Sequence, residues 1–108
     1  MADTSRSSGV LSASAIIVKN TCRLKSVHFS AFAAGPDIVT IKVWDSKDAT
    51  TSGNTELARF VTKANQTVFN IEYDMHGVLA REGLYLQILN SEGSPNADTF
   101  HHVSVEFN

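Results

Sequence analysis

The chain lacks several features that identify whole classes of protein. It has one cysteine, Cys22, so it cannot form an internal disulfide, and we expect this residue to be buried and unreactive at the start of a strand. No apolar run approaches the roughly 20 residues of a membrane helix, and the N-terminus has no signal-peptide core. With 9 basic and 11 acidic residues, it also lacks the positive excess needed for nucleic acid. We therefore expect a soluble protein that binds neither membranes nor nucleic acid.

Motifs of catalysis and of metal binding are scarce as well. The sequence has no Gly-x-Ser-x-Gly nucleophile motif, and its acidic residues are scattered over different segments. His101 and His102 are neighbours, and neighbours on a strand point to opposite faces, so one metal ion does not readily bind both. His28 and His76 have no ligand partner at a recognisable spacing. We expect no enzyme activity, no cofactor and no bound metal.

Two metal hypotheses stay open at this stage. Asp45 and Asp48 share a polar loop with Ser46, in partial similarity to a calcium loop, although Lys47 and the missing further acidic ligands count against it. In a symmetric trimer, one histidine of each chain would meet its copies on the axis and form a metal-binding or pH-sensitive site. Elemental analysis, and assembly in the presence of a chelator, would test the second hypothesis.

The chain does have a clear alternation of apolar and polar residues with a period of two, which is typical of strands with one buried face. Strands are expected at residues 10–19, 22–32, 38–44, 56–60, 67–73, 84–88 and 99–107. Turns are expected at 33–37 and 63–66, and a loop at 90–98.

An eighth strand within residues 75–79 would complete a jelly roll, whereas residues 78–82 are alternatively read as one helical turn. Residues 1–9 are small and polar, so we expect a flexible arm there. The sequence therefore predicts an all-β antiparallel β-sandwich, jelly-roll-like, of about 7–8 strands, with a single domain over residues 10–108.

The clearest unit lies at residues 37–60, where two strands flank a polar loop of residues 45–55. Alternate residues from Val39 to Val43 share one face of the first strand, so we expect Trp44 to point away from the core. A tryptophan kept outside the core at the start of a polar loop is typical of a contact surface. We predict that a partner binds at this rim and at the N-terminal arm, through Arg6, Trp44, Asp45, Asp48 and Asn54.

Five short motifs, taken in order, resemble those of one protein family. They are Cys22-Arg23-Leu24, Val39-Thr40-Ile41-Lys42-Val43-Trp44-Asp45, Ser52-Gly53-Asn54-Thr55, Gly83-Leu84-Tyr85-Leu86 and Val103-Ser104-Val105-Glu106-Phe107. In this order they resemble the small β-sandwich virion proteins of tailed bacteriophages, over nearly the whole chain after Gly9. The chain departs from that pattern in its longer segments at 74–83 and 90–98.

The resemblance implies a non-enzymatic structural protein of a bacteriophage virion. Such a chain would be a capsid decoration or cement protein that lies on the capsid surface and stabilises the head. Its partners would be the major capsid protein or another virion protein, and it would form a homo-oligomer, with a trimer favoured. Many weak contacts of such an oligomer add through multivalency.

The same family includes proteins of tails and fibres, so a second function stays open. The chain would then be a carbohydrate-binding or host-adsorption module, with Trp44 and Tyr85 stacking on sugar rings. Loss of particle stability on removal of the protein favours the first function, and loss of host attachment favours the second.

Overall fold

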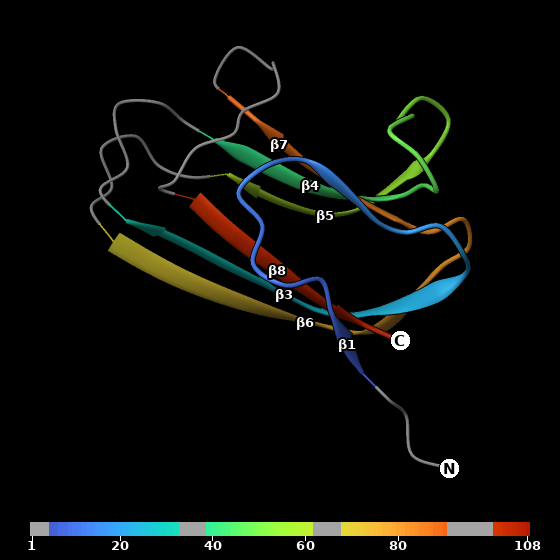
Figure 1. Ribbon diagram of the computed structural model, residues 1–108, viewed down its shortest axis with the longest axis horizontal. Coiled ribbons are helices and arrows are strands. Elements are labelled where there is room, and N and C mark those ends of the chain that lie inside the picture. Colours follow the sequence, from blue (N-terminus) through green and yellow to red (C-terminus); the bar gives the residue numbers. More distant parts are fainter. Residues whose placement is uncertain (1–4, 33–38, 62–67, 91–100) are drawn as a thin grey trace.

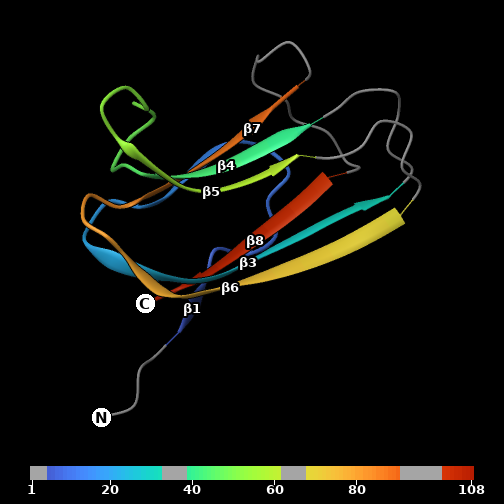
Figure 2. The ribbon, with the colours of Figure 1, turned by 180° about the vertical axis from the view of Figure 1, so that it is seen from behind.

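Eight β-strands are present in the computed structural model, which describes residues 5–32, 39–61, 68–90 and 101–108 (Figure 1). In chain order they are β1 (Arg6–Ser7), β2 (Ala15–Val18), β3 (Cys22–Phe32), β4 (Thr40–Asp45), β5 (Thr55–Val61), β6 (Val68–Ala80), β7 (Leu84–Leu89) and β8 (His101–Phe107). The strands form two sheets that face one another (Figure 2). Among the described residues there is no helix that is long and apolar enough to cross a membrane.

The strand order is that of a jelly roll. Sheet A has the order β1-β8-β3-β6, and sheet B has the order β2-β7-β4-β5. The antiparallel pairs β1–β8, β2–β7, β3–β6 and β4–β5 form one long hairpin. This hairpin folds over on itself, and the pairs β3–β8 and β4–β7 close the two sheets. The predicted all-β antiparallel sandwich is confirmed, and the topology is the eight-stranded jelly roll.

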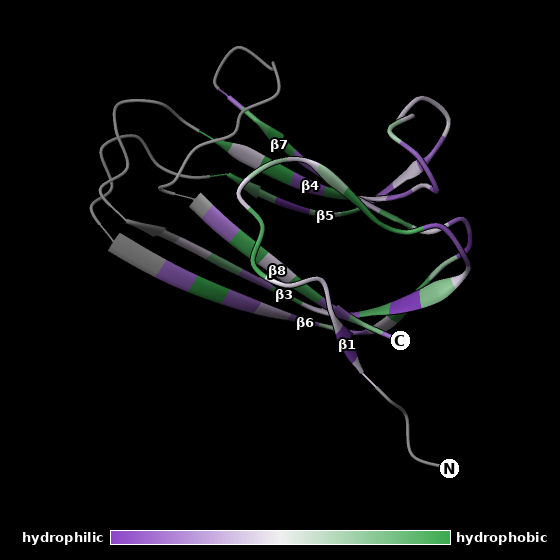
Figure 3. Cartoon of the chain, in the orientation of Figure 1, coloured by the Kyte–Doolittle hydropathy of each residue, from purple (hydrophilic) through white to green (hydrophobic). Residues whose placement is uncertain are grey.

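The core lies between the two sheets and follows from the alternation along each strand. In β4, Ile41 and Val43 are fully buried, whereas Lys42 lies on the outer face. Apolar and polar residues alternate in the same way along β3, β6 and β8 (Figure 3). The largest fully buried side chains are Phe29, Leu24, Ile41, Leu84, Leu86, Ile88, Val27, Val39, Val43, Val103 and Val105. Cys22 is also buried, as predicted.

An irregularity in the β3–β6 pair interrupts the edge strand of sheet A. Between Leu24 and Ser26 of β3 there is one residue, whereas the opposite segment of β6 has three, residues 75–77. His76 and Gly77 adopt positive φ values of 56° and 74° there. Such a bulge accommodates extra residues and bends the strand. The edge of β6 is therefore regular only on either side of this bulge.

Two expectations for this region were wrong. Residues 75–79 do not form a separate strand, and residues 78–82 do not form a helical turn, because β6 stays paired with β3 as far as Ala80. The cross-strand hydrogen bonds along β3 outweigh the weak local preference for a single turn. The turns expected at 33–37 and 63–66, and residues 91–98 of the expected loop, lie outside the described residues.

The eighth strand comes instead from the segment expected to be a flexible arm. Within residues 1–9, β1 pairs with the end of β8, with Arg6 opposite Phe107. The backbone N–H of Ser8 also donates to the carbonyl of Val105, at 2.9 Å. Backbone hydrogen bonds hold this polar segment although it buries little apolar surface. The expectation of a flexible arm was therefore wrong for the second half of residues 1–9. Residues 1–4 lie outside the described residues.

The strand predicted at residues 10–19 is split between the two sheets. Leu11 exchanges two backbone hydrogen bonds with Val103 of β8, at 2.7 and 2.8 Å, in sheet A. Ala15–Val18 instead pairs with β7 in sheet B. The chain passes from one sheet to the other between these two contacts. Alternation along the sequence does not reveal such a crossing, because both halves keep a period of two.

Candidate functional site

Asp45, a predicted contact residue, anchors a turn of the fold. Its carboxylate accepts hydrogen bonds from the backbone N–H groups of Arg81 and Glu82, at 3.0 and 2.8 Å, and a longer one from Gly83. These groups belong to the connection between β6 and β7. Because backbone donors surround the carboxylate, Asp45 ties the end of β4 to this connection. A structural role is therefore observed where a contact role was predicted.

Asp48 and Asn54 order the loop between β4 and β5 around a buried hydroxyl group. Ser46 Oγ lies 2.7 and 2.9 Å from the carbonyl oxygens of Asp48 and Thr50. The Asn54 amide donates to the Thr50 carbonyl at 2.8 Å. The Asp48 carboxylate accepts from the backbone N–H of Thr50 at 2.9 Å, and this bond keeps the pKa of Asp48 below its usual value. Sequence reasoning missed Ser46, the buried centre of the loop.

The loop also forms a polar hollow of about 230 Å³, lined by Ser46, Lys47, Asp48, Thr50, Ser52, Asn54 and Glu82. The hydroxyl of Ser46, one carboxylate oxygen of Asp48 and the carbonyl oxygen of Thr50 already accept hydrogen bonds within the loop. Within the described residues, no group of three or more His, Cys, Asp or Glu side chains is placed to hold a metal ion.

Trp44 lies on the outer face of sheet B, as its phase in the strand predicted. Its indole Nε1–H donates to Oε1 of Gln87 at 3.0 Å, and the ammonium of Lys42 lies 5.7 Å from the ring centroid. Tyr85 is directly opposite Trp44, and Ile16 is opposite Tyr85. Tyr85 is only 9% exposed. Of the pair predicted to stack on sugars, Tyr85 is thus buried, and Trp44 is half-buried with its indole N–H already hydrogen-bonded.

The outer face of sheet B also carries a small ion-pair network. Glu56 contacts Arg59 at 2.7 Å and Lys42 at 3.7 Å. The guanidinium of Arg59 lowers the pKa of Glu56, mainly through its hydrogen bonds. Arg6, by contrast, lies on β1 in sheet A. The structure therefore groups four of the five predicted contact residues at one end of sheet B and leaves Arg6 apart from them.

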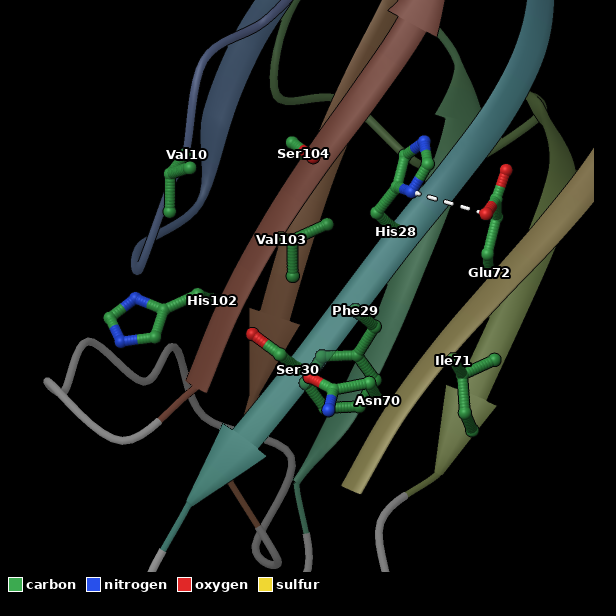
Figure 4. A pocket seen from close by; sticks show the side chains of 10 residues that line it. All are labelled: Val10, His28, Phe29, Ser30, Asn70, Ile71, Glu72, His102, Val103 and Ser104. Carbon is green, nitrogen blue, oxygen red and sulfur yellow. Dashed lines mark ion pairs between the residues drawn. The ribbon is translucent and has the colours of Figure 1, made fainter. Parts of the chain in front are cut away.

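A hollow on the outer face of sheet A is here called the sheet A groove (Figure 4). Its volume is about 380 Å³, and three neighbouring strands, β8, β3 and β6, form its floor. Register places its polar side chains in two rows across these strands. One row is His102, Ser30 and Asn70, and the other is Ser104, His28 and Glu72. Val10 stands at the rim beside β8.

A serine, a histidine and a glutamate meet beside this groove in an order that resembles a catalytic triad. Ser26 Oγ lies 3.1 Å from His28 Nε2, and His28 Nδ1 lies 3.9 Å from a carboxylate oxygen of Glu72. The hydroxyl of Ser26, however, donates its one proton to Glu106 at 3.2 Å. Glu106 therefore competes with His28 Nε2 for the one hydroxyl proton that a general base would accept.

The remaining geometry also disfavours a nucleophile. Ser26 is only 5% exposed, so a substrate cannot reach its oxygen. The separation of 3.9 Å between His28 and Glu72 exceeds a hydrogen bond. The arrangement is therefore a cross-strand polar network that supports the groove.

The two sheets leave an apolar gap along the strands β5 and β6, here called the open edge. Its hollow of about 220 Å³ is lined by Leu57, Ala58, Arg59, Phe60, Tyr73 and Met75. The rings of Phe60 and Tyr73 are in contact, with centroids 4.8 Å apart. Tyr73 is nevertheless 50% exposed and Val61 is 61% exposed. Within the described residues, no other strand pairs with the outer side of β5 or β6.

Sequence reasoning identified neither the groove nor the open edge. The alternation did place His28 and Ser30, and likewise His102 and Ser104, on the polar side of their strands. It did not show that those strands are neighbours. The alternation along β6 places Tyr73 on the same side as the core residues. Its exposure follows from the position of β6 at the edge of the sheet.

Comparisons of the chain with protein-family models, with curated proteins and with solved structures found no match. The function is therefore inferred from these surfaces and from the resemblance of the motifs.

Proposed function

We propose that the chain is a non-enzymatic structural protein of a bacteriophage virion, a decoration protein that assembles with copies of itself and binds the capsid surface. The motif resemblance points to this function, and the open edge supports it as an assembly surface. Nothing in the proposal requires a cofactor. The Ser26, His28 and Glu72 arrangement fits it too, because Ser26 is buried and its hydroxyl is hydrogen-bonded to Glu106.

The exposed apolar side chains of the open edge carry this proposal. Val61 and Tyr73 expose large apolar surface beside two strand edges that no other described strand pairs with. Exposed large apolar side chains at a strand edge are typical of a contact site, and open strand edges favour pairing with another chain. A monomer would keep the apolar side chains and the strand edges in water, whereas an oligomer would bury them.

A second copy of the same chain fits the open edge by charge. Along β5 the edge carries Arg59, which also pairs with Glu56 of the same strand, and along β6 it carries Glu72 and Asp74; the side chains of Arg59, Glu72 and Asp74 are well exposed. When β5 of one copy lies beside β6 of another, opposite charges meet, whereas two β6 edges would bring carboxylates together. Head-to-tail contacts of this kind close into a ring when the rotation permits, and the resemblance favours a trimer.

The mass of the protein in solution tests the assembly. We expect a homo-oligomer that dissociates when Val61 and Tyr73 are both changed to serine. The matched control is Val10→Ser, because Val10 is apolar, even more exposed (72%) and distant from the open edge in the strand order. A wild-type monomer, or a double variant with unchanged mass, would contradict the proposal.

Binding to capsids tests the decoration function itself. We expect the wild-type protein to sediment with expanded phage shells, and particles lacking the protein to lose DNA at lower temperature. The double variant should bind shells more weakly because it presents fewer linked contacts. Particles that keep full stability but no longer attach to the host would refute the head location.

A further inference from the structure

The sheet A groove has the dimensions of a small polar ligand. Strands lie about 4.8 Å apart, so a row of three side chains across three strands is about 10 Å long. The two rows lie two residues apart along each strand, which is about 7 Å. The groove holds about 380 Å³ and is bounded on one side by Val10 (Figure 4). One or two sugar rings would fill this space.

The lining combines hydrogen-bond donors and acceptors. Asn70 offers both on one amide, Ser30 and Ser104 offer hydroxyl groups, and the Glu72 carboxylate accepts only. In the part of the chain that the structure describes, the side chains of Ser30, Asn70 and Ser104 make no hydrogen bond to other protein groups. Asn70 and Glu72 are exposed. These groups are therefore open to a ligand.

Charge and polarity select among ligands. Among the described residues, no lysine or arginine lines the groove, and the Glu72 carboxylate repels anions, so phosphates and nucleic acid fit poorly. An apolar ligand would leave the polar lining without hydrogen bonds, which is costly. A sugar hydroxyl both donates and accepts, so neighbouring hydroxyls match a mixed lining. The apolar side chain of Val10, at the rim, suits the C–H face of a sugar ring.

We propose that the sheet A groove binds a neutral saccharide, with Asn70, Ser104, His28 and Glu72 as the hydrogen-bonding residues and Val10 as the apolar wall. This site lies on the outer face of sheet A and shares Glu72 with the β6 side of the open edge, but it does not depend on the decoration function. It also differs from the sugar site that the sequence predicted at Trp44 and Tyr85, where Tyr85 is buried.

An array of neutral glycans, followed by NMR titration of the ¹⁵N-labelled full chain, tests the proposal. The probes for the titration are the glycans retained on the array, with inorganic phosphate as the anionic comparison. We expect backbone amide shifts at Ser30, Asn70, Glu72 and Ser104, and none with phosphate. Asn70→Ala should weaken binding about five- to tenfold, as expected for the loss of one or two net hydrogen bonds.

Two further variants localise the binding. Thr40→Ala, on the outer face of sheet B, should leave the affinity unchanged. Trp44→Ala should also leave it unchanged, and loss of binding in that variant alone would move the site to sheet B and overturn the proposal. Absence of any retained neutral glycan, or stronger shifts with phosphate, would overturn it as well. Shell binding by Asn70→Ala should equal that of the wild type, which separates the two functions.

Discussion

Replacement of Gly83 by alanine should strongly destabilise the fold. Gly83 precedes β7 at a φ of 152°, where residues with a side chain are strained. An added Cβ would lie 2.2 Å from the carbonyl oxygen of Val18 and 3.0 Å from that of Ser46. Both are backbone atoms at the ends of β2 and β4, so neither moves without disturbing sheet B.

The expected cost follows from these two effects. A strained φ costs about 1–3 kcal/mol, and displacement of backbone in a packed sheet adds an amount similar to overpacking, about 1–3 kcal/mol. We expect a loss of about 4 kcal/mol, a large share of the 5–15 kcal/mol that is typical of a domain. Gly53→Ala is the matched control, because Gly53 also has a positive φ of 80° but no atom lies within 4 Å of its added Cβ. It should cost only about 1–2 kcal/mol.

Urea unfolding followed by circular dichroism measures both variants. With a slope of about 2 kcal/mol per M, the Gly83 variant should unfold at about 2 M less urea than the wild type. The Gly53 variant should shift by at most about half of that. If the two variants lost the same stability, the close approach of Gly83 to Val18 and Ser46 would be refuted.

Two further predictions follow from the ionisable groups. Because Arg59 lowers the pKa of Glu56 from its ordinary 4.5, the ion pair stabilises the fold above that pH and is lost as the pH falls through the lowered pKa. Glu56→Gln should cost at most about 1 kcal/mol at pH 7 and flatten the acid side of a stability–pH curve; an unchanged slope would contradict this. Burial raises the pKa of the Cys22 thiol, so a disulfide reagent should modify the native protein far more slowly than the protein in urea. Equal rates would show that Cys22 is accessible.

The alternation of apolar and polar residues was sufficient to predict a strand wherever one face of that strand is buried. Cys22–Phe32 was predicted with its observed bounds, and the outward position of Trp44 was correct as well. Pattern failed at the crossing after Leu11 and at the bulge of residues 75–77. In both places a partner strand distant in sequence determines the conformation. The alternation within one segment carries no information about that partner.

The predicted contact residues also show the difference between what the local sequence indicates and what distant segments determine. Asp45 and Asp48 look available in the sequence because both are polar and lie in a loop. In the structure, backbone N–H groups from the same loop and from the β6–β7 connection occupy their carboxylates. Conversely, the sheet A groove gathers ordinary polar residues from three strands, and none of them is unusual by itself.

The sequence by itself determined the class of fold, the buried faces and the shortage of catalytic motifs, because alternation with a period of two is a local property of each strand. Only the tertiary structure decided which strands are neighbours. That choice depends on pairing between distant segments, such as β3 with β8, and it places His28 beside Ser104 in one groove. It also leaves β5 and β6 at an edge of their sheets, so that Tyr73, which alternates with polar residues like a core residue, is half exposed.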